Sequence, residues 1–239
     1  MVNILIPLAG KNKFFPEAEY PFPKPLIEIG ENTMIEMVVN NFSYIQEKCF
    51  IFIVNEEDCK KFHIDNTLKL LTNDNCKIIK LQNETKGAAC SALMAIEYIN
   101  NDIPLIISNA DQIIEKDIKN IIKNFTNYDA GVITFESVHP RWSFVKTDEN
   151  NLVIEATEKR PISKNAIAGF YYFNKGEDFV SSAMSMIKKD ANVNGIYYIA
   201  PSLNEMILNN KKVGIYKIEN NQYNTFYTPQ KIEEYKRRI

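Results

Sequence analysis

Residues 4–15 read I-L-I-P-L-A-G-K-N-K-F-F, and residues 21–26 read P-F-P-K-P-L. A short apolar strand breaks here into a glycine-containing loop, and Lys24 follows between two prolines. Small residues such as Ala9 and Gly10 let backbone N–H groups approach an anion, and a lysine held by prolines can place a cation on the same phosphate chain. The start of the sequence therefore indicates phosphate chemistry, whereas a glycine loop alone would more often be a simple turn.

The first half of the sequence alternates apolar runs with segments of helical period. The runs are nearly continuous, as in strands covered on both faces, and they span Val2–Pro7, Phe50–Asn55, Cys76–Leu81, Ile103–Ser108 and Ala130–Phe135. The helical segments between them are Met34–Phe42, Cys59–Leu71, Lys86–Ile99 and Lys116–Phe125. This order predicts a Rossmann-like α/β fold, with a mixed, mostly parallel sheet flanked by helices and ligands at the carboxyl ends of the strands.

After about residue 136 the pattern changes. Trp142–Thr147 and Leu152–Ala156 flank D-E-N-N and predict a small β-hairpin. The remaining predicted elements are a strand at Ile167–Phe173, helices at Glu177–Lys189 and Ser202–Asn210, a strand at Val213–Ile218 and a helix at Pro229–Arg238. No stretch rich in Pro or Ser divides the sequence, so 239 residues predict a single domain spanning residues 1–239.

Composition limits the partners and the compartment. A formal net charge of −2 argues against a nucleic-acid-binding surface, which would need a basic face. No apolar stretch reaches transmembrane length, and the four cysteines form no C-x-x-C pair. We therefore expect a cytoplasmic protein with reduced thiols and no membrane partner. Packing of the C-terminal helices against a second copy stays open.

Seven short motifs follow one another in a specific order. They are L-A-G at 8–10, P-K-P-L at 23–26, Q-N-E-T-K-G-A-A at 82–89, N-A-D at 109–111, E-K-R-P-I-S at 158–163, A-G-F-Y-Y-F at 168–173 and Y-T-P at 227–229. Together they resemble the sugar-phosphate nucleotidyltransferases, also called nucleoside-diphosphate-sugar pyrophosphorylases, and most of all the bacterial branch found in capsule and lipopolysaccharide clusters. The resemblance implies a GT-A-like fold with a nucleotide-binding half at 1–135 and an acceptor-binding half at 136–239.

The resemblance also implies an activity. A sugar or polyol phosphate attacks the α-phosphate of a nucleoside triphosphate and expels pyrophosphate, with CTP the preferred nucleotide here and UTP the next. Lys24 would contact the reacting phosphates, and Asp111 would hold Mg²⁺ through its carboxylate. The implied nucleotide-binding residues are Leu8, Ala9, Gly10, Lys11, Lys13, Gln82, Gly87 and Asn109. The implied acceptor-binding residues are Glu158, Lys159, Arg160 and Trp142.

Three positions depart from the family pattern. Asn12 and Phe14 stand where relatives carry a second glycine and an arginine, so Lys11 or Lys13 would have to supply that charge without an arginine's fork. Thr225, with Asn224 beside it, replaces a second metal-binding aspartate. Arg160 adds positive charge next to Lys159 and favours a phosphorylated acceptor.

Two other functions therefore stay open. A GT-A glycosyltransferase would share the strand-end acid but would not need Lys24 between prolines. A non-catalytic nucleotide-sensing module would keep the fold and lose the chemistry, as the missing arginine and the missing aspartate suggest.

Overall fold

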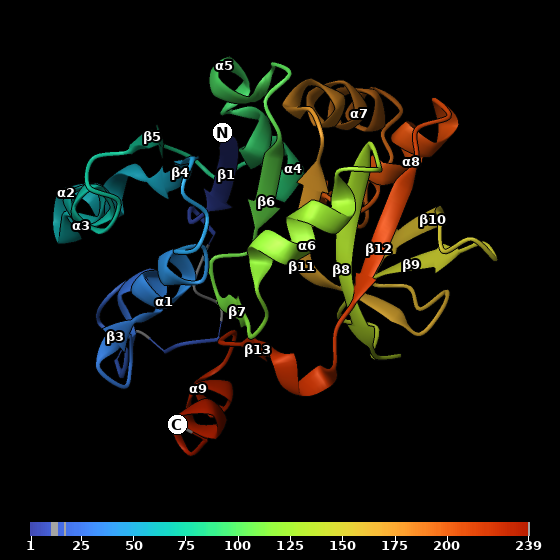
Figure 1. Cartoon of the computed structure of the whole chain (residues 1–239). Coiled ribbons are helices and arrows are strands. Elements are labelled where there is room, and N and C mark those ends of the chain that lie inside the picture. The colour runs from blue at the N-terminus through green and yellow to red at the C-terminus, as the bar shows by residue number, and fades with distance from the viewer. Residues whose placement is uncertain (11–13, 17, 239) are drawn as a thin grey trace.

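The computed structural model describes residues 1–10, 14–16 and 18–238. A central sheet dominates it, and within the described residues this sheet has nine strands in the order β10-β9-β11-β6-β1-β4-β5, with β8 beside β11 and β12 beside β8 (Figure 1). The bounds are β1 Val2–Pro7, β4 Lys48–Asn55, β5 Cys76–Leu81, β6 Leu105–Ser108, β8 Ala130–Glu136, β9 Ser143–Thr147, β10 Val153–Glu158, β11 Asn165–Phe173 and β12 Val213–Lys217. Only β10 and β11, among these described strands, run against the others. The predicted α/β fold with a mixed, mostly parallel sheet and a hairpin is confirmed.

Helices cover both faces of the sheet because strand residues alternate between two cores. In β1, Ile4 and Ile6 face one core and Leu5 faces the other. The first core receives α1 (Met34–Asn40), α2 (Glu56–Phe62), α3 (Ile64–Leu71) and α6 (Ile118–Phe125). The second receives α4 (Ala88–Leu93), α5 (Ile96–Ile99), α7 (Gly176–Lys188) and α8 (Ser202–Leu208).

A third, smaller core lies beyond the end of β6. It joins Phe15, Ile29, Met34, Ile113 and Phe226 with Ile232 of α9 (Pro229–Lys236). Two short sheets form here, β2 (Glu28–Ile29) with β3 (Asn32–Thr33), and β7 (Gln112–Ile114) with β13 (Tyr223–Thr225). Figure 1 shows β7, β13 and α9 together at the end of the molecule that carries the C-terminus. This region brings residues from both ends of the sequence together.

Two of the predicted helices are each divided in the structure. The expected helix at Cys59–Leu71 is α2 followed by α3, because His63 between them has left-handed backbone (φ 53°). The α2 helix also begins earlier than predicted, since the Asn55 side chain accepts a hydrogen bond from the Glu57 amide at 2.8 Å. The expected helix at Lys86–Ile99 is α4 followed by α5, with a turn around Ala95.

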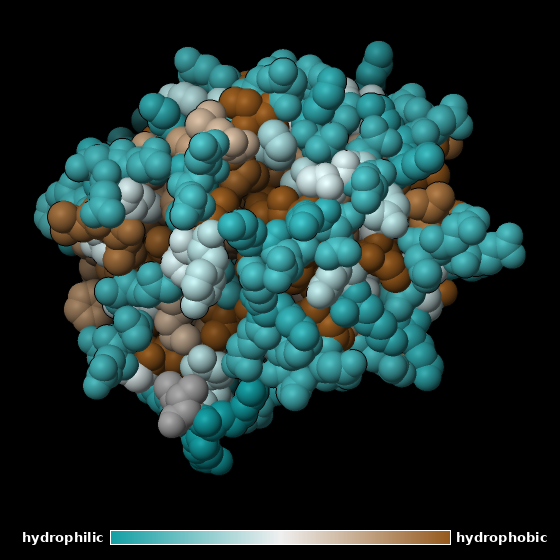
Figure 2. Space-filling model, viewed as in Figure 1, coloured by the Kyte–Doolittle hydropathy of each residue, from teal (hydrophilic) through white to brown (hydrophobic). Residues whose placement is uncertain are grey.

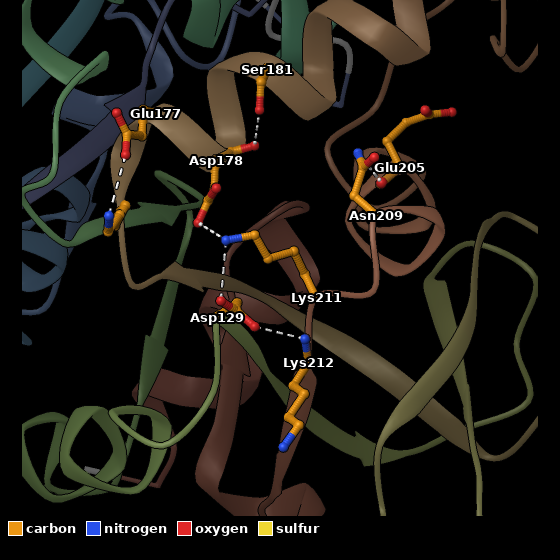
Figure 3. Close-up of polar contacts among 9 residues, drawn as sticks. Asp129, Glu177, Asp178, Ser181, Glu205, Asn209, Lys211 and Lys212 are labelled. Atoms are coloured by element: carbon orange, nitrogen blue, oxygen red, sulfur yellow. Dashed lines mark hydrogen bonds and ion pairs between the residues drawn. The ribbon is translucent and has the colours of Figure 1, made fainter.

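An ion-pair cluster connects the segments before β8 and β12 with helix α7 (Figure 3). Lys211, just before β12, donates to Asp129 before β8 and to Asp178 in α7, each at 3.3 Å. The amide of Lys212 donates to the same Asp129 carboxylate at 2.8 Å, while its amine points away in Figure 3. These contacts fix three element starts relative to one another, on residues separate from the cleft described below.

The surface view agrees with a sheet enclosed by amphipathic helices. Figure 2 shows a face that is mostly hydrophilic, with hydrophobic residues visible in hollows between polar side chains. Within the described residues, every helix is too short or too polar to cross a membrane.

Candidate active site

A cleft of about 460 Å³ opens at the carboxyl ends of β1, β5 and β6. Ligands of open α/β sheets bind at this edge. The cleft is lined by Pro7, Leu8, Ala9, Gly10, Lys24, Pro25, Leu81, Glu84, Thr85, Gly87, Ala88, Ser91, Asn109, Ala110, Asp111 and Ile196. It thus brings together seven residues singled out from the sequence, namely Leu8, Ala9, Gly10, Lys24, Gly87, Asn109 and Asp111.

Backbone forms one wall of the cleft. A side chain added at Gly10 would meet no atom of the described residues within 4 Å. Gly87 has φ +120°, and a Cβ there would lie 2.4 Å from the Tyr197 carbonyl oxygen, so only glycine fits at the start of α4. Leu8 lines the cleft, but its amide donates to the Ile53 carbonyl at 2.7 Å and is therefore not free for an anion.

Lys24 and Asp111 meet in this cleft. Lys24 begins a short 3₁₀ turn (Lys24–Leu26) between Pro23 and Pro25, and its Nζ donates a hydrogen bond to Asp111 Oδ2. Both side chains keep about a quarter of their surface exposed, at 23% and 25%. The amine also lies 5.8 Å from the centre of the Phe15 ring. A ligand entering the cleft therefore meets a cation and a carboxylate side by side.

A bulge in β11 positions the loop that carries Asp111. The pairing of β11 with β8 shifts register between Ile167 and Tyr171, and Gly169 lies inside this shift with φ +56°. Its carbonyl accepts hydrogen bonds from the Asn109 amide at 3.0 Å and from Gln112 Nε2 at 2.9 Å. The backbone carbonyl of Gly169, in the A-G-F motif, thus holds Asn109 of the N-A-D motif and Gln112 just after it.

Strand β13 lies directly behind Asp111. The Phe226 amide donates to the Asp111 carbonyl at 2.7 Å, and Thr225 is paired with Gln112. Asn224 is buried on the other side of the strand, where its carboxamide contacts Glu115 and Arg238 at 2.7 Å each. Thr225 is therefore paired with the residue after Asp111, and Asn224 is engaged by Glu115 and Arg238.

Asp111 supplies the only predicted metal ligand that the structure places in the cleft. Among the described residues, no group of three or more His, Cys, Asp or Glu side chains is arranged to hold a metal ion. A single carboxylate suits Mg²⁺, which takes one or two carboxylates and completes its shell with water and phosphate oxygens.

A second cluster, the hairpin corner, consists of Trp142, Ser143, Glu158 and Lys159. Ser143 Oγ donates to Glu158 Oε2, and the Lys159 amide donates to the Trp142 carbonyl at 3.0 Å. Burial raises the pKa of Glu158, while the Ser143 hydroxyl and the charge of Lys159 act in the opposite direction. The corner therefore combines a shielded carboxyl group with an adjacent lysine.

Lys159 projects from a left-handed backbone position, with φ 56°. Its Nζ donates to the Tyr198 hydroxyl at 2.6 Å and lies 4.8 Å from the centre of the same ring. No ion pair joins Lys159 to a carboxylate within the described residues. The Lys159 ammonium group is thus positioned by the neutral Tyr198 side chain, which leaves its positive charge uncompensated and suits the binding of an anion.

Arg160 and Trp142 are differently engaged. Arg160 donates to Glu155 Oε1 at 2.6 Å on the exposed side of the hairpin, so an acid already compensates its charge. Trp142 packs its ring 5.3 Å from Phe135 and 5.8 Å from Tyr223. In the hairpin corner it offers its carbonyl, while its ring belongs to an aromatic cluster.

One predicted nucleotide-binding residue is not among those that line the cleft. Gln82 is exposed and follows Leu81, the last residue of β5, which does line it. Lys11 and Lys13 lie outside the described residues.

Sequence reasoning missed the loop before α8. Ile196 lines the cleft, Tyr197 exchanges backbone hydrogen bonds with Lys86 and Ala89 at 2.7 and 3.0 Å, and Tyr198 holds Lys159. The loop therefore touches both the cleft and the hairpin corner. No local motif marks it, because its role comes from contacts made more than 35 residues away along the chain, as the Tyr198–Lys159 separation of 39 shows.

Two tyrosines lie between the two clusters. Burial, with the charge of Asp111, raises the pKa of Tyr223 well above its ordinary value, and its hydroxyl donates to Gln112 Oε1 at 2.9 Å. Burial and the Glu158 carboxylate likewise raise the pKa of Tyr171. Both phenols therefore stay protonated.

A family model for nucleotidyl transferases matches residues 20–213, which is most of the sequence. The chain belongs to the nucleotidyl transferase family. A curated relative of this nucleotidyl transferase is the bifunctional protein GlmU of Methanococcus aeolicus, 25% identical over 213 residues, or 82% of this chain. The chain spans about half the length of that relative, at 49%.

Solved structures support the same assignment. A nucleoside-diphosphate-sugar pyrophosphorylase from Vibrio cholerae RC9 aligns with a TM-score of 0.85 and 25% identity, over 98% of this chain and 99% of its own. A glucose-1-phosphate thymidylyltransferase described as putative, from Bacillus anthracis with bound sucrose, aligns at 0.78 and 18% identity, over 100% and 96%. A UDP-glucose pyrophosphorylase solved with UDP-glucose aligns at 0.79 and 16%, over 100% and 98%. The last two share the fold of this nucleotidyl transferase.

Proposed function

We propose that this chain condenses a nucleoside triphosphate with a phosphorylated sugar or polyol, giving the nucleoside-diphosphate sugar or polyol and pyrophosphate. The observation that carries the proposal is the meeting of Lys24 and Asp111, 87 positions apart in sequence, in a cleft at the strand ends. Both reactants are anions, so the site must neutralise charge and align the attack, and no protein nucleophile is needed. Membership of the nucleotidyl transferase family supports this activity.

Each side chain has a proposed part in this reaction. Lys24 binds the phosphates at the reacting end, and the backbone of Ala9, Gly10 and Gly87 allows close approach of the nucleotide. Asn109 lines the same cleft. Glu158 and Lys159 bind the acceptor's hydroxyls and its phosphate, with Trp142 offering its carbonyl. Parts for Lys11, Lys13, Gln82 and Arg160 rest on the family resemblance alone.

Mg²⁺ is the proposed cofactor, with Asp111 as its carboxylate ligand. When bound, the ion would supply positive charge to the triphosphate, which lowers the repulsion against the incoming acceptor phosphate. Lys24 has a second role before the ion binds, because its hydrogen bond keeps the Asp111 carboxylate oriented in the cleft.

CTP is the proposed nucleotide, with UTP second, and the product is proposed to serve surface polysaccharide synthesis in the cytoplasm. The two structures of similar fold are named for other nucleotides, one as a thymidylyltransferase and one as a UDP-glucose pyrophosphorylase, so the base must be determined by experiment. Pyrophosphate release should be measured with each of the four NTPs against a panel of sugar and polyol phosphates. Release with one pair and not with the others would support the proposal and identify both substrates.

The same assay separates the alternatives. A glycosyltransferase would consume a nucleotide sugar without releasing pyrophosphate and would keep its activity in Lys24→Ala. A nucleotide-sensing module would be stabilised against heat by a nucleotide and release no pyrophosphate with any pair. Phe14 and Thr225, at positions where relatives carry an arginine and an aspartate, are the features that favour this second alternative.

A further inference from the structure

Arg141 carries a guanidinium group that is stacked but not neutralised. Its Cζ lies 4.4 Å from the centre of the Tyr227 ring and 5.9 Å from that of Trp142. The residue is exposed, and within the described residues no carboxylate forms an ion pair with it. Stacking on aromatic rings orients a guanidinium without using its N–H donors. Arg141 therefore presents a free donor fork in a fixed place.

That place is next to Asp111. The Phe226 amide donates to the Asp111 carbonyl at 2.7 Å, and the Phe226 side chain is buried in the third core. Tyr227 is the next residue along the chain, beyond the end of β13. Tyr223, at the start of β13, donates to Gln112, the residue after Asp111. The ring that supports Arg141 thus belongs to the residue next to the one that contacts the Asp111 backbone.

The supports of Arg141 and Lys24 are joined by adjacent residues. The Phe14 ring packs edge-on against the Tyr227 ring, with their centres 6.3 Å apart. The neighbouring Phe15 lies 5.8 Å beneath the Lys24 amine. The aromatic residues that contact the two cations, Phe15 for Lys24 and Tyr227 for Arg141, are therefore linked through Phe14.

The chemistry of the site requires a second cation here. Lys24 shares its positive charge with Asp111, whereas a triphosphate meeting an acceptor phosphate brings several negative charges. A guanidinium offers paired N–H donors that match phosphate oxygens. Phe14 occupies the loop position where an arginine is expected. Its ring contacts the Tyr227 ring, which in turn contacts the Arg141 guanidinium.

We propose that Arg141 binds a phosphate group at the reacting end of the cleft, as a second cation beside Lys24. The inference rests on the proposed function, because it takes the reacting phosphates to lie at Lys24 and Asp111. The phosphate could belong to the leaving pyrophosphate or to the acceptor, and two probes distinguish these sources.

The test is calorimetric binding of inorganic pyrophosphate and of inorganic phosphate, each in the presence of Mg²⁺, to the full chain. Wild type is compared with Arg141→Met, Arg141→Lys and the control Lys146→Met, an exposed lysine on the same hairpin. Losing a charge-assisted contact should weaken binding in Arg141→Met by about 10- to 100-fold. Arg141→Lys should fall between Arg141→Met and wild type, and Lys146→Met should match wild type.

Each outcome decides the inference. Weaker binding of pyrophosphate assigns Arg141 to the leaving group, and weaker binding of inorganic phosphate alone assigns it to the acceptor. Unchanged binding of both probes in a folded Arg141→Met, or no binding of either by wild type, would overturn the inference. The probes need no turnover, so a chain that binds pyrophosphate through Arg141 yet releases none from any substrate pair would refute only the proposed function.

Discussion

The carboxamide of Asn109 occupies the space that a Cβ at residue 169 would need, with its Nδ2 2.3 Å from that position. Gln112 Oε1 approaches the same point to 2.3 Å, and the Gly169 backbone has φ +56°. The loop that carries Asp111 is therefore packed into a gap that only glycine leaves open.

Gly169→Ala should destabilise the fold by roughly 2–4 kcal/mol, since left-handed strain adds to a steric clash with Asn109. Gly195→Ala is the matched control, because Gly195 also has positive φ (+77°) but no atom of the described part of the chain lies within 4 Å of its Cβ position. Its loss should be about 1–2 kcal/mol, from strain alone. Urea unfolding measures both, and equal losses would show that Asn109 does not depend on the glycine.

Tyr198→Phe should raise the KM for the acceptor about 3- to 10-fold and leave the KM for the nucleotide unchanged. The change removes the hydroxyl that accepts from Lys159 at 2.6 Å and keeps the ring beneath the amine. Steady-state kinetics with each substrate varied in turn measures the effect, and Tyr44→Phe, on an exposed tyrosine, is the control. A rise in the nucleotide KM instead would contradict this assignment of Lys159.

Glu158→Gln should become more stable than wild type as the pH rises. Burial raises the pKa of Glu158, so the native state holds this proton more tightly than the unfolded state. Wild-type stability therefore falls as pH rises from the ordinary carboxyl pKa through the raised one, and glutamine has no proton to lose there.

The difference in unfolding free energy between Glu158→Gln and wild type should thus grow across that window and then level off. Urea titrations at a series of pH values provide the measurement. Glu149→Gln, in the exposed hairpin turn, controls for the loss of one surface carboxyl group. If both variants followed the same pH dependence, the shielding of Glu158 would be disproved.

Lys211→Met should destabilise the fold by roughly 1–2 kcal/mol, a figure reduced for partial exposure, because Asp129 and Asp178 would lose the cation between them. Lys212→Met is the control, since only the Lys212 amide contacts Asp129 and the mutation keeps that amide (Figure 3). Thermal unfolding measures both, and nucleotide KM should not change in either. A Lys212→Met loss as large as that of Lys211→Met would rule out the ion-pair explanation.

Strands that carry their own apolar runs were predictable from sequence. The bounds of β1 agree with Val2–Pro7, because a buried strand shows a nearly continuous apolar run. The bounds of β5 agree with Cys76–Leu81 as well, although Lys77 and Lys80 of this edge strand are exposed. The three-residue strands β7 and β13 were missed because such short segments show no periodicity. Their pairing depends on residues more than 100 positions apart, as Tyr223 and Gln112 are.

The candidate site was predictable to the same degree. Lys24, Gly87 and Asp111 follow strand ends or lie in marked motifs, and the parallel sheet gathers such positions at one edge. The contacts of Tyr198 with Lys159 and of Arg141 with Tyr227 were not predicted, because each joins segments that are distant in sequence. Gln82 stays a prediction, because it is exposed and is not among the residues that line the cleft.

The most direct test of the central claim is the rate of pyrophosphate release by Lys24→Ala, measured with the best NTP and sugar-phosphate pair. We predict that kcat/KM falls at least about 100-fold, because the cation beside Asp111 is lost at the reacting phosphates. Lys116→Ala, on an exposed lysine outside the cleft, should match wild type. A folded Lys24→Ala that released pyrophosphate at the wild-type rate would contradict the account.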